Sequence, residues 1–299
     1  MNSATRFRIN TASLVGKTVA VTGTTGGLGV PLCRYLASCG ADLVLLDRNA
    51  EKSAAFEAAL QRDFPRCRIS RIPLDLENTA AVFEAVAALK AANVDIFIHN
   101  AGAYSIPRHR CDTGFDNVFQ INCAAPYTLI RELLPHLRER CGHVVAVGSI
   151  AHNYSKIDEA DIDFSSRKAA SKVYGNAKRH LMFSLYELFK NEREVTLAVT
   201  HPGIAFTNIT AHYPPLLFAL IKHPMKWIFM KPRTACLSLL RGVFEPTKHS
   251  TWIGPRFFNV WGLPATQKLH TASHEEITRI ARETEAIYDN LKSKETQRT

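Results

Sequence analysis

The chain of 299 residues lacks the features of a disulfide-stabilised, metal-binding or secreted protein. Its seven cysteines are dispersed, odd in number and without Cys-x-x-Cys spacing, which argues for reduced thiols and against a disulfide framework or a zinc site. The twelve histidines are scattered along the chain, and we expect no metal site. The first ten residues lack the continuous apolar run of a signal peptide. The reduced thiols indicate a cytosolic setting, so we expect a cytoplasmic protein.

The sequence also lacks a hydrophobic run long enough to span a membrane. Its most apolar segment, residues 214–230, is interrupted by Lys222, Pro224 and Lys226, whereas a spanning helix needs about 20 apolar residues. Three alternatives stay open for this segment. It could roof an apolar substrate pocket, it could rest peripherally on a membrane surface with its lysines towards anionic headgroups, or it could pack in the core or a dimer interface.

Charge is unevenly balanced, with a net value of +10 at pH 7. Such a surplus favours nucleic acid, anionic lipid or a phosphate-rich cofactor as a partner, or it belongs to a solvated basic surface. No basic-aromatic recognition motif accompanies the charge, so we predict no nucleic-acid partner.

What the sequence does have is an alternation of apolar strand-like runs with helical segments. Strands are predicted at 17–22, 42–46, 68–74, 95–99, 143–147 and 195–200, with helices near 31–39, 50–62, 79–91, 114–139 and 170–190. This rhythm predicts an α/β fold: one doubly wound, Rossmann-type domain with a mostly parallel sheet of about seven strands and helices on both faces. Ligands of such sheets bind beyond the carboxyl ends of the strands.

We expect a single dinucleotide-binding and catalytic domain over residues 1–299, with a core at about 14–265. After residue 204 the alternation breaks, and we interpret 204–232 as a substrate-binding insertion. Residues 266–299 are predicted to form a C-terminal helical tail.

A glycine-rich turn, Thr22-Gly-Thr-Thr-Gly-Gly-Leu-Gly29, joins the first predicted strand to the first helix. Glycines allow the backbone to approach a pyrophosphate closely, and the helix N-terminus supplies amide donors and a favourable dipole. The alternative is a merely tight turn. In this strand-turn-helix setting the motif favours a dinucleotide site, with the candidate contacts Gly23, Thr25, Gly27, Leu28 and Gly29.

Two adjacent residues after the second strand point to different cofactors. Asp47 stands at the strand end, where a carboxylate can accept from the adenosine ribose hydroxyls and repel a 2′-phosphate. Arg48 could instead bind that phosphate, or it could be a solvent-exposed or adenine-stacking side chain. We favour NAD(H) over NADP(H), because Asp47 takes the strand-end position and the glycine turn carries no second basic residue.

Tyr174 and Lys178 lie four residues apart on a predicted helix and therefore share one face. We expect the ammonium to favour the phenolate and to lower the pKa of Tyr174 from its usual value of about 10. Ser149 follows the fifth strand in Val147-Gly-Ser-Ile-Ala151, where its hydroxyl could donate to a substrate oxygen. The sequence there is not Gly-x-Ser-x-Gly, which disfavours a hydrolase.

Together these residues resemble the short-chain dehydrogenase/reductase family over about residues 14–265. The turn fits the family pattern Thr-Gly-x-x-x-Gly-x-Gly through Thr22, Gly23, Gly27 and Gly29. It equally fits the pattern of the nucleotide-sugar epimerase branch, Thr-Gly-x-x-Gly-x-x-Gly, so this motif alone does not choose between the two branches.

Four further segments match the family. Leu74-Asp75-Leu76 resembles its adenine contact, His99-Asn-Ala-Gly102 its Asn-Asn-Ala-Gly motif, Phe119-Gln-Ile-Asn122 the segment of its catalytic asparagine, and His201–Thr207 its nicotinamide-side segment. Histidine at 99 and alanine at 205 depart mildly from the family's residues. The resemblance implies the cofactor contacts Asp75, Leu76, Asn100, Ala101, Gly102, Tyr174, Lys178, Pro202, Gly203, Ile204 and Thr207.

The resemblance also implies a catalytic set of Asn122, Ser149, Tyr174 and Lys178. Tyr174 would exchange a proton with the substrate oxygen, Lys178 would lower its pKa and bind the nicotinamide ribose, Ser149 would steady that oxygen, and Asn122 would position a water. The expected activity is NAD(P)(H)-dependent hydride transfer between nicotinamide and an alcohol or carbonyl. Family members are commonly homo-oligomers, and we expect one here.

Ile150-Ala-His152, Ile162-Asp-Phe164 and Trp261-Gly-Leu-Pro264 look like segments of the retinol-dehydrogenase and WW-domain oxidoreductase-like members. They indicate a lipophilic substrate of retinoid, steroid or aldehyde type. Two other hypotheses remain: a nucleotide-sugar epimerase or dehydratase with tightly bound NAD, and a non-catalytic dinucleotide-binding interaction protein.

Overall fold

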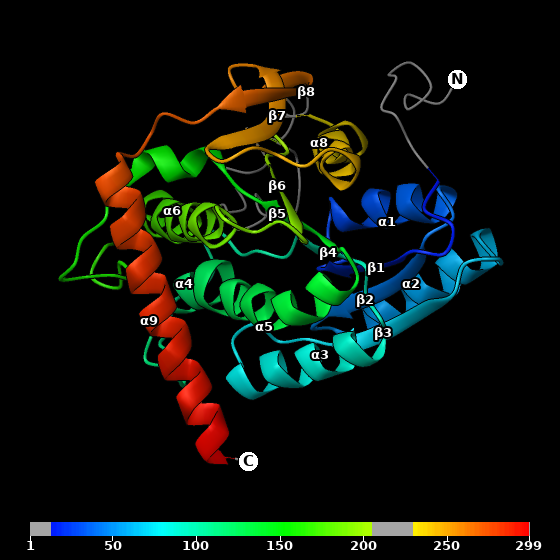
Figure 1. Ribbon diagram of the computed structural model, residues 1–299, viewed down its shortest axis with the longest axis horizontal. Coiled ribbons are helices and arrows are strands. Elements are labelled where there is room, and N and C mark those ends of the chain that lie inside the picture. Colours follow the sequence, from blue (N-terminus) through cyan, green and yellow to red (C-terminus); the bar gives the residue numbers. More distant parts are fainter. Residues whose placement is uncertain (1–12, 205–229, 299) are drawn as a thin grey trace, which may run out of the picture.

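The computed structural model describes residues 13–204 and 230–298 (Figure 1). In these ranges eight strands form one sheet in the order β3-β2-β1-β4-β5-β6-β7-β8. Neighbouring strands run parallel except β7 and β8, which form an antiparallel hairpin. The strands are β1 (Thr18–Thr22), β2 (Asp42–Asp47), β3 (Ile69–Pro73), β4 (Ile96–His99), β5 (His143–Val147), β6 (Thr196–Thr200), β7 (Thr251–Phe257) and β8 (Trp261–Lys268).

Helices cover both faces of the sheet, because the central strands bury apolar side chains on both sides. Val19 and Val21 face a core cluster with α1 and α8, whereas Ala20 faces a second cluster with α3, α5, α6 and α9 (Figure 1). The helices are α1 (Gly29–Ser38), α2 (Ala50–Asp63), α3 (Thr79–Ala91), α4 (Asn117–Phe119), α5 (Ala125–Glu139), α6 (Ala170–Leu188), α8 (Pro232–Phe244) and α9 (His274–Arg298).

The predicted doubly wound α/β fold is confirmed, with one strand more than the predicted number. All six strands predicted by position are present. The helix expected at 114–139 is divided: α4 and α5 flank a π-helical turn, Gln120–Ala124. A π-turn has i→i+5 hydrogen bonds, which hydrophobic periodicity does not distinguish from ordinary helix over such a short stretch.

The C-terminal helix α9 is tied to the helical layer by polar contacts. The Tyr127 hydroxyl donates to Glu285 at 2.5 Å, and buried Arg179 of α6 pairs with Glu276 at 2.8 Å. The predicted helical tail is thus helical from His274 onward, whereas residues 266–268 still belong to β8.

Most of the predicted insertion at 204–232 lies outside the described residues. Its two ends meet, since the amide of Met230 donates to the carbonyl of Ile204 at 2.9 Å. Among the helices within 13–204 and 230–298, none is long and apolar enough to cross a membrane. The single-domain division and the role of the insertion stay predictions.

Candidate active site

The glycine turn after β1 is held against the end of β4. Asn100 donates from its side-chain amide to the carbonyls of Thr22 and Gly23, both at 3.0 Å. The Thr22 hydroxyl in turn accepts from the amides of Asn100 and Ala101 at 3.0 and 2.9 Å. A Cβ atom at Gly29 would lie 2.2 Å from the Gly23 carbonyl, so the turn can close only around glycine.

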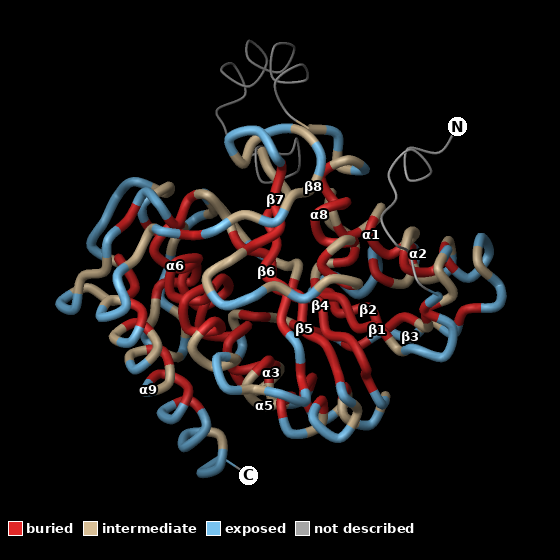
Figure 2. Tube along the Cα trace, turned by 45° about the horizontal axis from the view of Figure 1, so that its top comes forward, coloured by how far each residue is buried: buried red, intermediate tan, exposed pale blue. Residues whose placement is uncertain are grey.

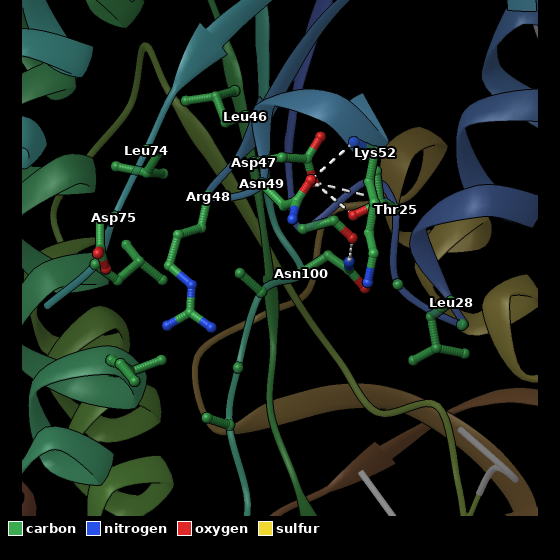
Figure 3. A pocket seen from close by; sticks show the side chains of 18 of the residues that line it. Thr25, Leu28, Leu46, Asp47, Arg48, Asn49, Lys52, Leu74, Asp75 and Asn100 are labelled. Carbon is green, nitrogen blue, oxygen red and sulfur yellow. Dashed lines mark hydrogen bonds between the residues drawn. The ribbon is translucent and has the colours of Figure 1, made fainter. Parts of the chain in front are cut away.

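Beyond this turn lies a cavity of about 390 Å³ at the carboxyl ends of the strands (Figure 3). The buried side-chain oxygen of Asn100, one of its lining residues, has no hydrogen-bond partner among the described atoms. Such an acceptor fits a ligand that brings a hydroxyl or amide donor. The predicted cofactor contacts that line the cavity are Gly23, Thr25, Gly27, Leu28, Asp47, Arg48, Asp75, Leu76, Asn100, Ala101 and Gly102.

The remaining predicted contacts have other places. Gly29 forms the inner wall of the turn rather than the lining. Tyr174, Lys178 and the segment Pro202–Ile204 do not line this cavity, which ends at Tyr104 on their side. Thr207 lies outside the described residues.

The carboxylate of Asp47 is occupied by the protein itself. It accepts hydrogen bonds from the hydroxyls of Thr24, Thr25 and Ser53 and from the amide of Thr25, and the residue is 6% exposed. These bonds brace the glycine turn against β2 and α2 (Figure 3). The expectation that Asp47 is available to a ribose therefore does not match its surroundings.

Two basic side chains line the outer part of the same cavity. Arg48 extends from the end of β2, with its side chain 69% exposed and only a 3.5 Å contact to Glu77 (Figure 3). Lys52, from the first turn of α2, is exposed and also lines the cavity. Sequence analysis missed Lys52, because its place in the cavity depends on how α2 is packed rather than on a motif.

The predicted proton-transfer residues lie on α6 and at the end of β5. Lys178 is 1% exposed, its ammonium donates to the carbonyl of Val147 at 3.0 Å, and it stands 5.8 Å from the centre of the Tyr174 ring. The Ser149 hydroxyl bonds to Tyr174 and accepts from the amide of Ala151 at 3.2 Å. The structure thus brings the three predicted side chains together.

The expected lowering of the Tyr174 pKa is wrong. Desolvation by the surrounding protein raises the pKa of Tyr174 to about 12, and the hydrogen bond from Ser149 offsets only part of this effect. Burial likewise lowers the pKa of Lys178 to about 8. The physical reason is that each charged form loses its hydration, and this loss outweighs the attraction of an ammonium that is directed to the Val147 carbonyl.

Asn122 lies in the π-helical turn between α4 and α5. Its side-chain amide donates to the carbonyls of Ala103 and Val118, both at 2.8 Å, and its oxygen accepts from the amide of Ala103 at 3.3 Å. A Cβ at Gly102 would meet the Asn122 oxygen at 2.8 Å and the Lys178 nitrogen at 3.7 Å. Gly102 therefore marks the place where both predicted side chains converge.

Comparisons with known proteins identify the family of this chain. The family model for short chain dehydrogenase matches residues 17–214. The chain belongs to the short chain dehydrogenase family. It is accordingly an NAD(P)-dependent oxidoreductase of alcohols and carbonyl compounds, as the sequence predicted.

Relatives and solved structures are similar to this chain. Retinol dehydrogenase 13 of Homo sapiens is 28% identical over 229 residues, which cover 74% of this chain and 69% of that protein. A complex of Pseudomonas aeruginosa RhlG with NADP is 25% identical, with a TM-score of 0.58 over 79% of this chain and 91% of that one. An uncharacterized Mycobacterium paratuberculosis protein shares the fold, with a TM-score of 0.70, 22% identity and 94% of each chain covered.

This short chain dehydrogenase also has a second tyrosine at the site that sequence analysis missed. Tyr104 lines the cavity and packs edge-on against Tyr174, with ring centres 5.3 Å apart and an interplanar angle of 83°. Its position two residues after Gly102 was the available signal.

One group of potential metal ligands occurs among the described residues. Glu77, His109 and Cys111 hold their ligand atoms within 4.8 Å of one another. The Asn117 amide donates towards Nδ1 of His109, which leaves the proton on Nε2, facing Glu77 at 2.7 Å. That arrangement is an ordinary hydrogen-bonded pair, and we assign no metal to it.

Proposed function

We propose that this short chain dehydrogenase transfers a hydride between NADP(H) and a lipophilic alcohol or carbonyl compound, with Tyr174 as the proton donor or acceptor. The observation that carries the proposal is the cluster of Tyr174, Lys178 and Ser149 at the strand ends beside the dinucleotide cavity. The bound nicotinamide would supply or accept the hydride. A retinoid is the substrate class that the name of the relative retinol dehydrogenase 13 suggests, and steroids and aldehydes are the other classes that the sequence resemblance indicates.

Proton transfer would fall to Tyr174. With a pKa raised to about 12, its hydroxyl keeps its proton at neutral pH and can donate it to a developing alkoxide. In the oxidation direction the same group must lose a proton, so the hydrogen bond from Ser149 and a charged Lys178 would have to stabilise the phenolate. The pKa of Lys178, lowered to about 8, leaves this ammonium charged at neutral pH.

Ser149 and Asn122 would position groups rather than exchange the proton. The Ser149 hydroxyl, already bonded to Tyr174, would hold the substrate oxygen near the phenol. Asn122 would fix the chain at Ala103 and keep its oxygen near Lys178, the place where a water could lead the proton outward. Both residues contribute through orientation, which the buried hydrogen bonds enforce.

The proposed preference for NADP(H) over NAD(H) rests on the charged side chains of the cavity. NAD(H) was predicted from Asp47, but the hydroxyls and amide around that carboxylate already saturate it. Arg48 and Lys52 instead offer two cations at the open part of the cavity, and a phosphate there would gain charge-assisted hydrogen bonds. This arrangement supports NADP(H) over NAD(H).

A turnover assay with Tyr174→Phe tests the proposed chemistry. The purified enzyme is screened with lipophilic alcohols, steroids and aldehydes, with NADP(H) and NAD(H) in parallel. Tyr174→Phe should retain cofactor affinity while kcat falls by about 10²–10⁴-fold, because only the acid–base group is removed. Wild-type turnover in this variant would refute the role of Tyr174.

Tyr35→Phe is the matched control for Tyr174→Phe. Tyr35 lies in α1, away from the cavity lining, so this variant should keep wild-type activity. Two further results would indicate the rival functions. Turnover without added cofactor, together with dinucleotide retained through purification, would indicate an epimerase or dehydratase instead. Cofactor binding with no oxidation of any substrate would indicate a non-catalytic protein. The predicted homo-oligomer is tested separately by light scattering.

A further inference from the structure

The β7–β8 hairpin exposes an unusual concentration of apolar side chains. Four of the six exposed large hydrophobic residues in the described chain lie in the seven-residue stretch 257–263 at its tip. They are Phe257, Phe258, Trp261 and Leu263, at 59%, 85%, 43% and 39% exposure. Figure 2 shows this tip as exposed chain projecting beyond the buried strands. Such a concentration of exposed apolar side chains, within one hairpin, is typical of an interaction site.

The backbone of the tip is strained at one of these residues, Phe258. Phe258 has a φ of 53°, a left-handed conformation that bulky residues seldom adopt, and Asn259 follows with a φ of 58°. The amide of Val260 donates to the carbonyl of Phe257 at 2.9 Å and closes the turn. Glycine or asparagine would suit position 258 better, so the strained phenylalanine suggests that its exposed ring has a use.

The sequence on both sides of the tip is rich in basic residues and poor in acidic ones. No acidic residue occurs between Glu194 and Glu245 or between Glu245 and Glu275, and Glu245 itself pairs with Arg241 at 2.8 Å. Arg256 adjoins the exposed phenylalanines, and Lys231 follows Met230, whose sulfur lies at Gly203 beside Val260. Neither cation belongs to an ion pair of the described residues.

We propose that the hairpin tip, defined as residues 256–263, docks on an anionic lipid surface. Phe257, Phe258 and Trp261 enter the boundary between headgroups and acyl chains, while Arg256 and Lys231 meet the lipid phosphates. Aromatic rings are favoured in this interfacial layer, and each basic residue near an anionic leaflet adds attraction. A second copy of this chain fits less well, because two such tips would bring like charges together.

Docking at this surface would orient the active site. The carbonyl of Asn259 accepts from Nε2 of His201 at 3.0 Å, and His201 precedes the predicted nicotinamide-side segment Pro202–Ile204. The tip therefore stands beside the substrate end of the site, and docking would turn that end towards lipid. The docking surface itself does not depend on the proposed reaction.

Vesicle flotation of the full chain tests the docking surface. With phosphatidylcholine–phosphatidylserine vesicles at low salt, the wild type should float, and high salt or pure phosphatidylcholine should weaken binding. The double variant Phe257→Ser/Phe258→Ser should lower the partition coefficient by about tenfold or more, since two rings lose burial. Arg256→Glu should lower it by about fivefold or more.

Val15→Ser is the matched control, because Val15 is 75% exposed but lies before β1, away from the hairpin. It should float as the wild type does. Circular dichroism and cofactor affinity report whether each variant is folded. Failure of the wild type to float, or wild-type flotation of the double variant, overturns the proposal. A dimer in light scattering that the double variant dissolves, without any vesicle binding, would assign the tip to self-association.

Discussion

At one end of the site, Arg48 and Lys52 stand in solvent at the rim of an open cavity; at the other, Lys178 is 1% exposed and Tyr174 is packed between Ser149 and Tyr104. The open end can bind a phosphate without a large desolvation cost, because its two cations are already exposed to solvent. The enclosed end changes the chemistry of its groups, because burial moves two pKa values towards neutral forms. In the proposed reaction, cofactor recognition belongs to the cavity rim and proton transfer to the buried cluster beyond Tyr104, so substitutions at the two places should fail in different ways.

The largest effect is expected from Lys178→Met at the enclosed end. Loss of the ammonium removes the charge that a phenolate needs, so kcat should fall by about 10²-fold or more. Stability should not fall with it, because an apolar side chain of similar size replaces a buried charge. Steady-state kinetics and urea unfolding measure the two quantities on one preparation.

Lys172→Met is the control for this comparison. Lys172 lies six residues earlier in the same helix but is exposed, and its ammonium bonds to the carbonyl of Tyr154. This variant should keep wild-type kcat. If Lys178→Met unfolded more easily while retaining turnover, the lysine would be structural and the contrast between the two ends would disappear.

The second effect concerns acid stability near the enclosed end. Burial lowers the pKa values of His152 and His201 to about 4, below the usual 6.5 of an unfolded histidine. The unfolded chain therefore binds more protons between these values, and stability that is present above pH 6.5 is lost as the pH falls towards 4. Each histidine can account for up to about 3 kcal/mol of this loss.

Urea unfolding across this pH range tests the assignment. His201→Phe should flatten the dependence, since it removes a titrating group while keeping an aromatic ring stacked on Trp252, 4.9 Å away. His270→Gln, at an exposed position, should leave the slope unchanged. An equal slope in the wild type and His201→Phe would show that His201 does not contribute to acid lability.

The sequence predicts those parts of this contrast that depend on residues close together in the chain, and not those that depend on packing between distant elements. The glycine turn, the strand-end residues and the Tyr174–Lys178 pair depend on local spacing. The structure has the turn directly after β1 and the pair on one helix, α6, although the pair does not line the cavity. The hydrogen bonds that occupy the Asp47 carboxylate come from Thr24 and Thr25 in the turn and from Ser53 in α2. No local sequence pattern predicts that these three hydroxyls meet at one carboxylate. The raised pKa of Tyr174 has the same origin, because desolvation is set by packing across several elements.

The third effect tests the open end. Arg48→Ala should raise KM for NADPH by about 10- to 100-fold, the value of a charge-assisted contact to phosphate, and leave KM for NADH and both kcat values nearly unchanged. Arg62→Ala is the control, since Arg62 is 75% exposed on α2 and pairs with Asp63 outside the cavity. A parallel rise of KM for both cofactors would mean that Arg48 contacts a part they share.

The smallest effect is expected from Asp47→Asn, which tests whether this carboxylate supports the turn or recognises the cofactor. If the carboxylate only braces the turn, asparagine should lower the affinity for NADH and NADPH equally. It should also lower the free energy of unfolding by about 1–2 kcal/mol, because one carboxylate oxygen becomes a donor that faces the hydroxyls of Thr24 and Ser53. If it instead recognises a ribose hydroxyl, NADH affinity should fall much more than NADPH affinity. Fluorescence titration with each cofactor, together with urea unfolding, distinguishes these results. A selective loss of NADH would restore Asp47 as a recognition residue and contradict the preference for NADP(H).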